Sequence, residues 1–135
     1  MLRSVKVRDY MTESLITFRP ETDLFRAINQ LLEYRISGSP VINEKGELVG
    51  LLSEVDCLRA ILTLTYHEEE KGGVVGDYMT RQVETIEHDA DIIAASKIFT
   101  ENGRRRLPVI HEGKLVGQIS RRDVLRAVEE FAQQG

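Results

Sequence analysis

The chain has 135 residues, of which 41% are apolar and 30% are charged, and its formal net charge is −4. This length suffices for one well-buried core, and no apolar run approaches the roughly 20 residues of a membrane span. The acidic balance argues against a general nucleic-acid coat, because such binding needs many phosphate contacts from Lys and Arg. The N-terminus has no apolar stretch of the secretory kind, so we expect a cytoplasmic location.

The sequence is duplicated along most of its length. Three motifs recur in the same order and with nearly the same spacing: Val7–Thr12 as Val75–Thr80, Ser39–Ile42 as Leu107–Ile110, and Gly50–Asp56 as Gly117–Asp123. Such self-similarity indicates two supersecondary units, each of which buries its apolar face against its copy. We therefore expect repeat 1 over residues 1–66, a linker over 67–74 and repeat 2 over 75–135, related by a pseudo-twofold axis.

Repeat 1 reads as β-α-β-β-α. We expect a strand at 15–18 and then a helix that begins near Thr22 or Asp23 and ends at Gly38 and Pro40. Strands at 40–42 and 48–52 follow, joined by a turn at 43–46, and a second helix begins around Ser53 or Glu54. Helical spacing predicts a core-facing stripe on the first helix, made of Leu24, Ala27, Ile28, Leu31 and Leu32. The second helix carries one apolar face, made of Val55, Leu58, Ile61 and Leu62.

Repeat 2 has the same order of elements. We expect a strand at 83–86, a helix that begins near Asp89 or Asp91 and ends at Gly103, a strand from Val109, a turn at Glu112–Gly113, a strand at 115–119, and a helix at 121–133. The residues predicted to face inward are Ile92, Ala95 and Phe99 on the first helix and Val124, Leu125, Val128 and Phe131 on the second. The fold class is therefore α+β.

The join between the last strand and the last helix of each repeat carries the pattern Gly-x-x-Ser-x-x-Asp. Its glycine lets another group approach the backbone closely. Ser53 and Ser120 stand where a hydroxyl can cap a helix or meet a ligand oxygen. Asp56 and Asp123 fall in the first helical turn, where the helix dipole favours a carboxylate that could also accept hydrogen bonds from a vicinal diol such as ribose. Plain helix capping is the alternative, and it explains the same residue types without a ligand.

Arginines are concentrated in repeat 2, at Arg104–Arg106 and Arg121–Arg122. A solvated face is the simplest explanation of such a run. However, positive charge is disfavoured at the start of a helix, and a phosphate nearby would account for it at Arg121 and Arg122. Glu54 occupies the position of Arg121 in repeat 1 and would repel the same group.

Together, the β-α-β-β-α order, the Asp-Tyr-Met-Thr openings, the Ser-Pro-Val and Leu-Pro-Val strands and the Gly-x-x-Ser-x-x-Asp endings resemble a tandem pair of CBS domains, a Bateman module. The resemblance covers roughly residues 5–130. It implies an adenine nucleotide (AMP, ADP or ATP) as a regulatory ligand in the cleft between the paired repeats, and less often S-adenosylmethionine or NAD. It also implies a homodimer, no obligatory cofactor, and a sensor role for an attached or partner protein.

The resemblance also assigns roles to individual residues. Asp56 and Asp123 correspond to the family's ribose-binding aspartates, and the segment before the second strand of each repeat often offers positive charge to phosphate. Repeat 2 keeps that charge and repeat 1 does not, so we expect repeat 2 to form the stronger site. The full predicted ligand-binding set is Thr17, Ser37, Gly38, Pro40, Ser53, Asp56, Thr85, Arg105, Arg106, Pro108, Ser120, Arg121, Arg122 and Asp123.

We expect no catalytic and no metal-binding residue. Cys57 has no histidine in local register to activate it and is predicted to be a small core residue. The histidines, His67, His88 and His111, look dispersed, and Ser53 and Ser120 lack a neighbouring base.

Our leading hypothesis is a non-enzymatic regulatory module that binds an adenosine-containing ligand. Because no effector domain is recognisable in this sequence, we expect it to signal to an effector protein in trans. The alternatives are a structural dimerisation module with no nucleotide and, less favoured, a nucleotide hydrolase.

Overall fold

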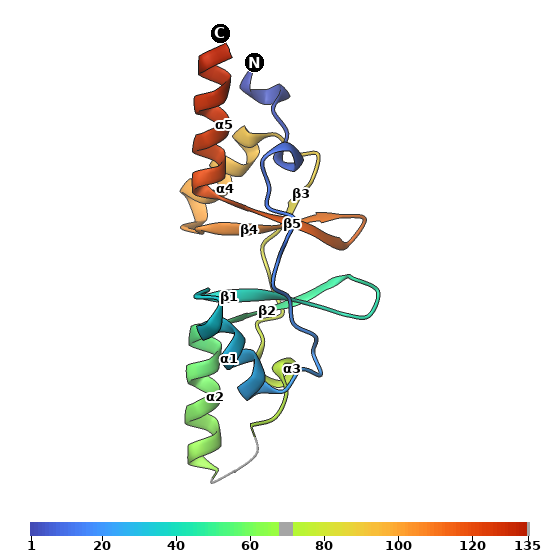
Figure 1. Cartoon of the computed structure of the whole chain (residues 1–135), viewed down its shortest axis with the longest axis vertical. Coiled ribbons are helices and arrows are strands. Elements are labelled where there is room, and N and C mark those ends of the chain that lie inside the picture. The colour runs from blue at the N-terminus through green and yellow to red at the C-terminus, as the bar shows by residue number, and fades with distance from the viewer. Residues whose placement is uncertain (68–71, 135) are drawn as a thin grey trace. The chain divides into compact units, whose positions relative to one another are not determined.

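The computed structural model describes residues 1–67 and 72–134, and these form two compact units (Figure 1). Unit 1 contains Met1–Leu15 and Glu84–Gly135, and unit 2 contains Ile16–Val83. Residues 68–71, which belong to the predicted linker, and the last residue lie outside the described part. Both units combine helices and strands, so the predicted α+β class is confirmed. None of the described helices is both long and apolar enough to cross a lipid bilayer.

Unit 2 is built on an antiparallel hairpin. Its elements are α1 (Leu24–Glu33), β1 (Gly38–Ile42), β2 (Leu48–Ser53), α2 (Glu54–Tyr66) and the short α3 (Val75–Tyr78). Helices α1 and α2 cover one face of the hairpin (Figure 1), because their apolar stripes need a partner surface. The largest fully buried side chains of this core are Phe18, Leu24, Leu52 and Val41.

Unit 1 repeats this plan with one more strand. After two short 3₁₀ helices (Leu2–Ser4 and Val7–Asp9) come β3 (Ile86–Glu87), α4 (Ile92–Asn102), β4 (Arg106–His111), β5 (Lys114–Ser120) and α5 (Arg121–Gln134). Strand β3 pairs in parallel with β4, and β4 pairs antiparallel with β5. The core is formed around Ile92, Leu107, Val109 and Ile119, and Phe99 and Ile86 also belong to it.

The two Asp-Tyr-Met-Thr segments each pair with the last strand of the other repeat. Thr12 exchanges two backbone hydrogen bonds with Gln118 of β5, at 2.8 and 2.9 Å. Thr80 does the same with Leu51 of β2, at 2.8 and 2.9 Å. The compact units therefore differ from the sequence repeats, because each opening segment is part of the unit built on the other repeat.

The glycine of each Gly-x-x-Ser-x-x-Asp motif makes room for this pairing. A Cβ atom on Gly117 would lie 2.6 Å from the Met11 sulfur and 3.0 Å from the Thr12 carbonyl oxygen. The same distances separate a Cβ atom on Gly50 from the Met79 sulfur and the Thr80 carbonyl oxygen. The expectation that these glycines admit another backbone is therefore confirmed.

Gly117→Ala should destabilise the protein by about 1–2 kcal/mol, because the Met11 thioether can move aside while the Thr12 carbonyl oxygen is held by the hydrogen bond that it accepts from the Gln118 N–H. Urea unfolding monitored by circular dichroism measures this loss. Unchanged stability would contradict the packing of the opening segment on β5.

The structure corrects two sequence expectations about the elements. The strand at 15–18 reduces to a single bridge between Phe18 and Val41, and the strand at 83–86 is instead β3 at Ile86–Glu87. The bridge is short because Pro20 follows and has no N–H to continue a ladder.

The second correction concerns which helix residues face the core. Leu32, Leu125 and Val128 were expected to be buried, but Leu32 and Leu125 are 71% and 68% exposed and Val128 is 37% exposed. Ala127 completes the buried face of α5 instead, and Ala60 does the same on α2. These small residues allow each helix to lie close to its sheet.

Cys57 is a core residue, as expected, with 7% exposure. Burial raises the pKa of its thiol, and the nearby Asp56 and Glu54 carboxylates raise the pKa further. We predict that Ellman's reagent labels the native protein at pH 8 much more slowly than it labels the urea-unfolded chain, since the thiolate is the reactive form. Equal rates in the two states would show that α2 does not shield the thiol.

Candidate ligand-binding site

The end of β5 and the start of α5 form a reciprocal cap in unit 1. The Asp123 backbone N–H donates to the Ser120 hydroxyl oxygen at 3.1 Å, and the Ser120 backbone N–H donates to the Asp123 carboxylate at 2.8 Å. Arg126, one turn further along α5, donates to the other carboxylate oxygen at 3.1 Å. The cap fixes the Asp123 side chain, which is 12% exposed.

Unit 2 has the equivalent cap at Ser53 and Asp56, but here the carboxylate receives more donors. The backbone N–H of Ser53 donates to it at 2.9 Å, and the Ser53 hydroxyl donates at 3.0 Å. Arg59 and the Thr80 hydroxyl donate to its other oxygen, each at 3.1 Å. The side chain of Asp56 is only 3% exposed.

The two aspartates therefore differ in free acceptor capacity. An ionised carboxylate offers about four acceptor positions. Asp56 accepts four hydrogen bonds, whereas Asp123 accepts two within the part of the chain that the structure describes. Asp123 can thus accept two further hydrogen bonds, such as those from neighbouring hydroxyls on a sugar, without giving up its cap.

Arginine side chains stand beside the unit 1 cap. Arg106 begins β4 and lies directly opposite Ser120 in the β4–β5 register. Arg105 precedes it, and its carbonyl oxygen accepts a hydrogen bond from the Arg121 backbone N–H at 3.1 Å. Arg105, Arg106 and Arg122 are all exposed. The strand register thus brings predicted site residues that are far apart in sequence to one end of β4 and β5.

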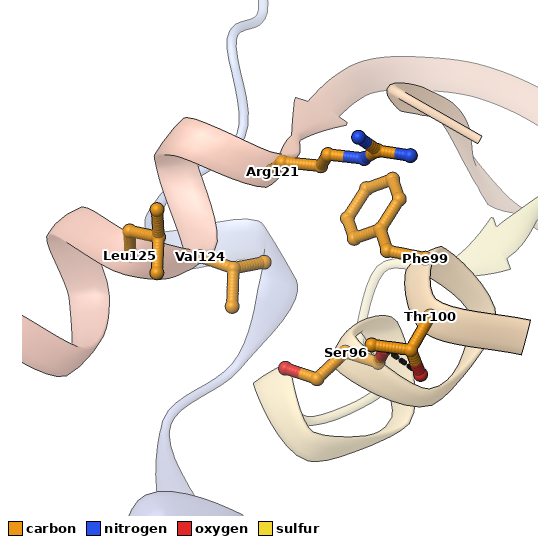
Figure 2. A pocket seen from close by; sticks show the side chains of 6 residues that line it. All are labelled: Ser96, Phe99, Thr100, Arg121, Val124 and Leu125. Atoms are coloured by element: carbon orange, nitrogen blue, oxygen red, sulfur yellow. Dashed lines mark hydrogen bonds between the residues drawn. The ribbon is translucent and has the colours of Figure 1, made fainter. Parts of the chain in front are cut away.

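Two other arginines of this run are engaged elsewhere. Arg104 pairs with Glu84 at 3.3 Å. Arg121 donates from Nε to the Arg104 carbonyl oxygen at 2.6 Å, and its guanidinium group lies near the Phe99 ring (Figure 2). Arg121 thus lines a hollow next to α4.

In unit 2 the same positions carry no positive charge. Gly38 lies opposite Ser53 in the β1–β2 register, and the Ser37 carbonyl oxygen accepts the Glu54 backbone N–H at 2.9 Å. The backbone hydrogen bonds at this end of the hairpin are therefore the same as in unit 1, but Glu54 takes the place of Arg121.

The remaining predicted residues have varied surroundings. Pro40 and Pro108 are buried at equivalent positions of β1 and β4, and Thr85 directly precedes β3. Thr17 lines a polar hollow of about 390 Å³ together with Arg19, Arg26, Gln30 and four other residues. None of the Gly-x-x-Ser-x-x-Asp residues lines that hollow.

Sequence reasoning missed the residues that hold the two carboxylates. Arg59 and Arg126 each stand three residues after the aspartate, so the repeated Asp-x-x-Arg pattern was an available signal. In the sequence, Thr80 stands out only as the end of the repeated Asp-Tyr-Met-Thr motif. Its contact with Asp56 depends on the pairing of this motif with strand β2 of the other repeat. Such a contact could not be read from local spacing.

The expectation that the histidines are dispersed is wrong for His88 and His111. Their rings stack with centroids 4.0 Å apart and an interplanar angle of 15°. The parallel β3–β4 register pairs Ile86 with Val109 and Glu87 with Ile110. His88 and His111 directly follow the second pair, so the register brings the two histidines together. Within residues 1–67 and 72–134, no group of three or more His, Cys, Asp or Glu side chains is placed to hold a metal ion.

The duplication seen in the sequence is also found when the chain is compared with known protein families. The family profile of the CBS domain matches residues 7–63 and again residues 75–130. The chain belongs to the CBS domain family. It is a tandem CBS pair, as the sequence resemblance implied.

Curated relatives of this CBS pair include longer proteins. MJ1225 of Methanocaldococcus jannaschii is 34% identical over 120 residues, which cover 89% of this chain and 41% of MJ1225. The chloroplastic CBS domain-containing protein CBSX1 of Arabidopsis thaliana is 34% identical over 157 residues, covering 96% of this chain and 66% of CBSX1. The chain therefore spans less than two thirds of either relative.

A solved structure extends the likeness to the fold. The crystal structure of CBSX2 in complex with AMP matches with a TM-score of 0.82 and 32% identity, covering 95% of this chain and 98% of that one. CBSX2 is thus a CBS pair of the same fold that binds AMP.

Proposed function

We propose that unit 1 of this CBS pair binds an adenine nucleotide, with AMP as the simplest ligand, and serves as a non-enzymatic regulatory module. The single observation that carries the proposal is the free acceptor capacity of Asp123. Two vicinal ribose hydroxyls would supply the two donors that this carboxylate lacks. Asp56 already has four donors and is proposed to be structural.

The nearby positive charge supports a phosphorylated ligand. Arg106 lies opposite Ser120, and Arg105 and Arg122 are its exposed neighbours on β4 and α5. Their planar guanidinium groups suit phosphate, because they make bidentate, charge-assisted hydrogen bonds. The N-terminus of α5 adds a helix dipole that favours an anion. We assign the base to the neighbourhood of Thr85, as the CBS resemblance implies.

Arg106→Ala should weaken AMP binding by about tenfold and leave adenosine binding unchanged, since a charge-assisted contact to phosphate is absent from the nucleoside. Arg104→Ala is the matched control, because Arg104 is already paired with Glu84 and should have a small effect. Isothermal titration of both ligands measures the difference. An equal loss for AMP and adenosine in the Arg106 variant would refute the phosphate role.

Regulation would follow if an effector protein distinguishes the nucleotide-bound state from the free state. A homodimer and an effector in trans are part of this proposal, and so is the cytoplasmic location expected from the sequence. The alternative, a structural module without nucleotide, is favoured by one observation: in each cap the serine and the aspartate hydrogen-bond to each other without a ligand.

Thermal unfolding in the presence of AMP, ADP, ATP, NAD, S-adenosylmethionine and adenosine tests the proposal. A ligand that binds only the folded state raises the Tm by mass action, and we expect a rise with at least one adenine nucleotide. No rise with any of these compounds at millimolar concentration would favour the structural module. A separate incubation of the protein with ATP tests the hydrolase alternative, because steady consumption of ATP would show enzymatic turnover.

A further inference from the structure

Unit 2 has a polar hollow beside the start of α1. Its volume is about 390 Å³, and its lining comes from residues 17–19 and 21–23 and from Arg26 and Gln30 on α1. All of these residues belong to unit 2. We call this space the unit 2 hollow. It shares no residue with the nucleotide site proposed in unit 1.

The Nε–H group of Arg19 is a donor without an acceptor. This nitrogen is buried, and it has no hydrogen-bond partner among the described residues. The far end of the same side chain pairs with Glu21, from Nη2 to Oε1 at 3.3 Å, and the side chain as a whole is 43% exposed. A buried donor without a partner costs about 1–3 kcal/mol, and more when the group is charged. An acceptor that enters the hollow and reaches Nε would remove this cost.

Arg26 stands where its own helix disfavours positive charge. It lies in the first turn of α1, and its backbone N–H donates to the carboxylate of the N-cap, Asp23, at 3.1 Å. A cation at this end of a helix opposes the helix dipole. Within the ranges 1–67 and 72–134, no carboxylate forms an ion pair with the Arg26 guanidinium group. An anion in the hollow would compensate both effects.

The duplicated sequence shows that the fold does not need these two arginines. In unit 1, Glu87 and Ala94 occupy the positions of Arg19 and Arg26. The helix cap is nevertheless the same, because the Ala94 backbone N–H donates to the Asp91 carboxylate at 2.8 Å. A solvated surface would explain an exposed guanidinium group, but it does not explain a buried Nε–H without an acceptor.

The donors of the hollow suit a tetrahedral oxyanion. The Thr22 hydroxyl oxygen accepts the Arg19 backbone N–H at 3.0 Å, and its O–H can still donate. Guanidinium groups bind phosphate through charge-assisted hydrogen bonds, and the oxygens of phosphate can meet donors from several directions. The Glu21 and Asp23 carboxylates also line the hollow and balance the two arginines. We therefore expect millimolar affinity for free phosphate.

We propose that the unit 2 hollow binds a phosphoryl group, either free phosphate or that of a small metabolite, through Arg19, Arg26 and the Thr22 hydroxyl. The Arg19 guanidinium group turns so that Nε–H donates to the bound oxyanion. This site goes beyond the proposed function, because it uses neither of the two motif aspartates and does not depend on a nucleotide in unit 1.

Titration of ¹⁵N-labelled protein with inorganic phosphate at constant ionic strength tests the site. The Arg19 Nε–H signal and the Arg26 amide signal should shift and saturate at millimolar phosphate, whereas sodium chloride should not shift them. Glycerol 3-phosphate distinguishes the two sources of the phosphoryl group: tighter binding than phosphate assigns a metabolite, and equal or weaker binding assigns free phosphate. These signals are separate from those of Ser120 and Asp123, so either site can fail without the other.

Two variants test the roles of the arginines. Arg26→Ala gives α1 the residue that unit 1 has at this position, and it should weaken phosphate binding about tenfold, because one charge-assisted contact is lost. Arg19→Lys keeps the charge but removes the Nε–H donor, and it should weaken binding about threefold or more. Lys97→Ala, at an exposed position of α4, removes the same charge elsewhere and is the control, with no expected effect.

Three results would overturn the proposal. The first is the absence of a saturable shift at Arg19 and Arg26 with millimolar phosphate. The second is full phosphate affinity in the Arg26→Ala variant. The third is a saturable response to acetate with none to phosphate, because it would assign the two arginines to a planar carboxylate.

Discussion

Replacing Asp123 by alanine should lower the affinity for AMP and for adenosine by the same factor, about 100-fold or more. The variant removes the acceptor of both ribose hydroxyls, and hydrogen bonds to a charged group are each worth about 1.5–3 kcal/mol. The common loss is the diagnostic feature, because the sugar is shared by the two ligands whereas the phosphate is not. Isothermal titration with each ligand measures it.

Asp123→Asn separates binding from folding. The amide oxygen can still accept the Ser120 backbone N–H, so the cap of α5 is largely kept, but the negative charge and half of the acceptor capacity are lost. We expect the urea midpoint of unfolding of this variant to be close to that of the wild type, and its affinity for both AMP and adenosine to be low. Full AMP affinity in the asparagine variant would remove Asp123 from the site.

Replacing Asp56 by alanine should have the opposite profile: roughly 3 kcal/mol less stability and little change in AMP affinity. Its buried carboxylate accepts hydrogen bonds from the Ser53 backbone and hydroxyl, from Arg59 and from Thr80. The variant loses the α2 cap and the contact that ties Thr80 to this helix, and such losses are typically about 1 kcal/mol for a cap and more for a charged network.

Urea unfolding of the Asp56 and Asp123 alanine variants, measured in parallel, checks this contrast. The two positions are equivalent in the duplicated sequence, so each variant is the matched control for the other. A larger stability loss for Asp123→Ala than for Asp56→Ala would contradict the different hydrogen-bond counts of the two carboxylates.

Much of the fold was predictable because it depends on local patterns. Asp23, Ser53 and Asp91 cap α1, α2 and α4 as their residue types indicate. Gly103 ends α4 in the left-handed region at a φ of 64°, where glycine carries no steric cost. The candidate site residues on β4, β5 and α5 were predicted from the CBS resemblance and from the repeated Gly-x-x-Ser-x-x-Asp pattern, and their role as a site stays a prediction.

What could not be predicted depends on contacts between distant segments. Helix α2 is apolar on two sides, so spacing alone did not tell the buried Cys57, Ala60 and Leu64 from the exposed Leu58 and Leu62. Such ambiguity is resolved only by the sheet against which the helix packs.

The same reason applies to the site itself. The fourth donor to Asp56 is Thr80, which reaches it because its opening segment pairs with β2. Duplication predicted two equal aspartates. The difference in their free acceptor capacity, on which the proposed site depends, became visible only in the folded chain.

Titration of ¹⁵N-labelled protein with AMP, followed by amide chemical shifts, tests the proposed site in unit 1 most directly. We predict that the amides of Arg105, Arg106, Ser120 and Asp123 shift first and saturate together, while those of Ser53 and Asp56 change little at the same AMP concentration. Shifts that begin at Ser53 and Asp56, or no saturable shift at either cap at millimolar AMP, would contradict this prediction.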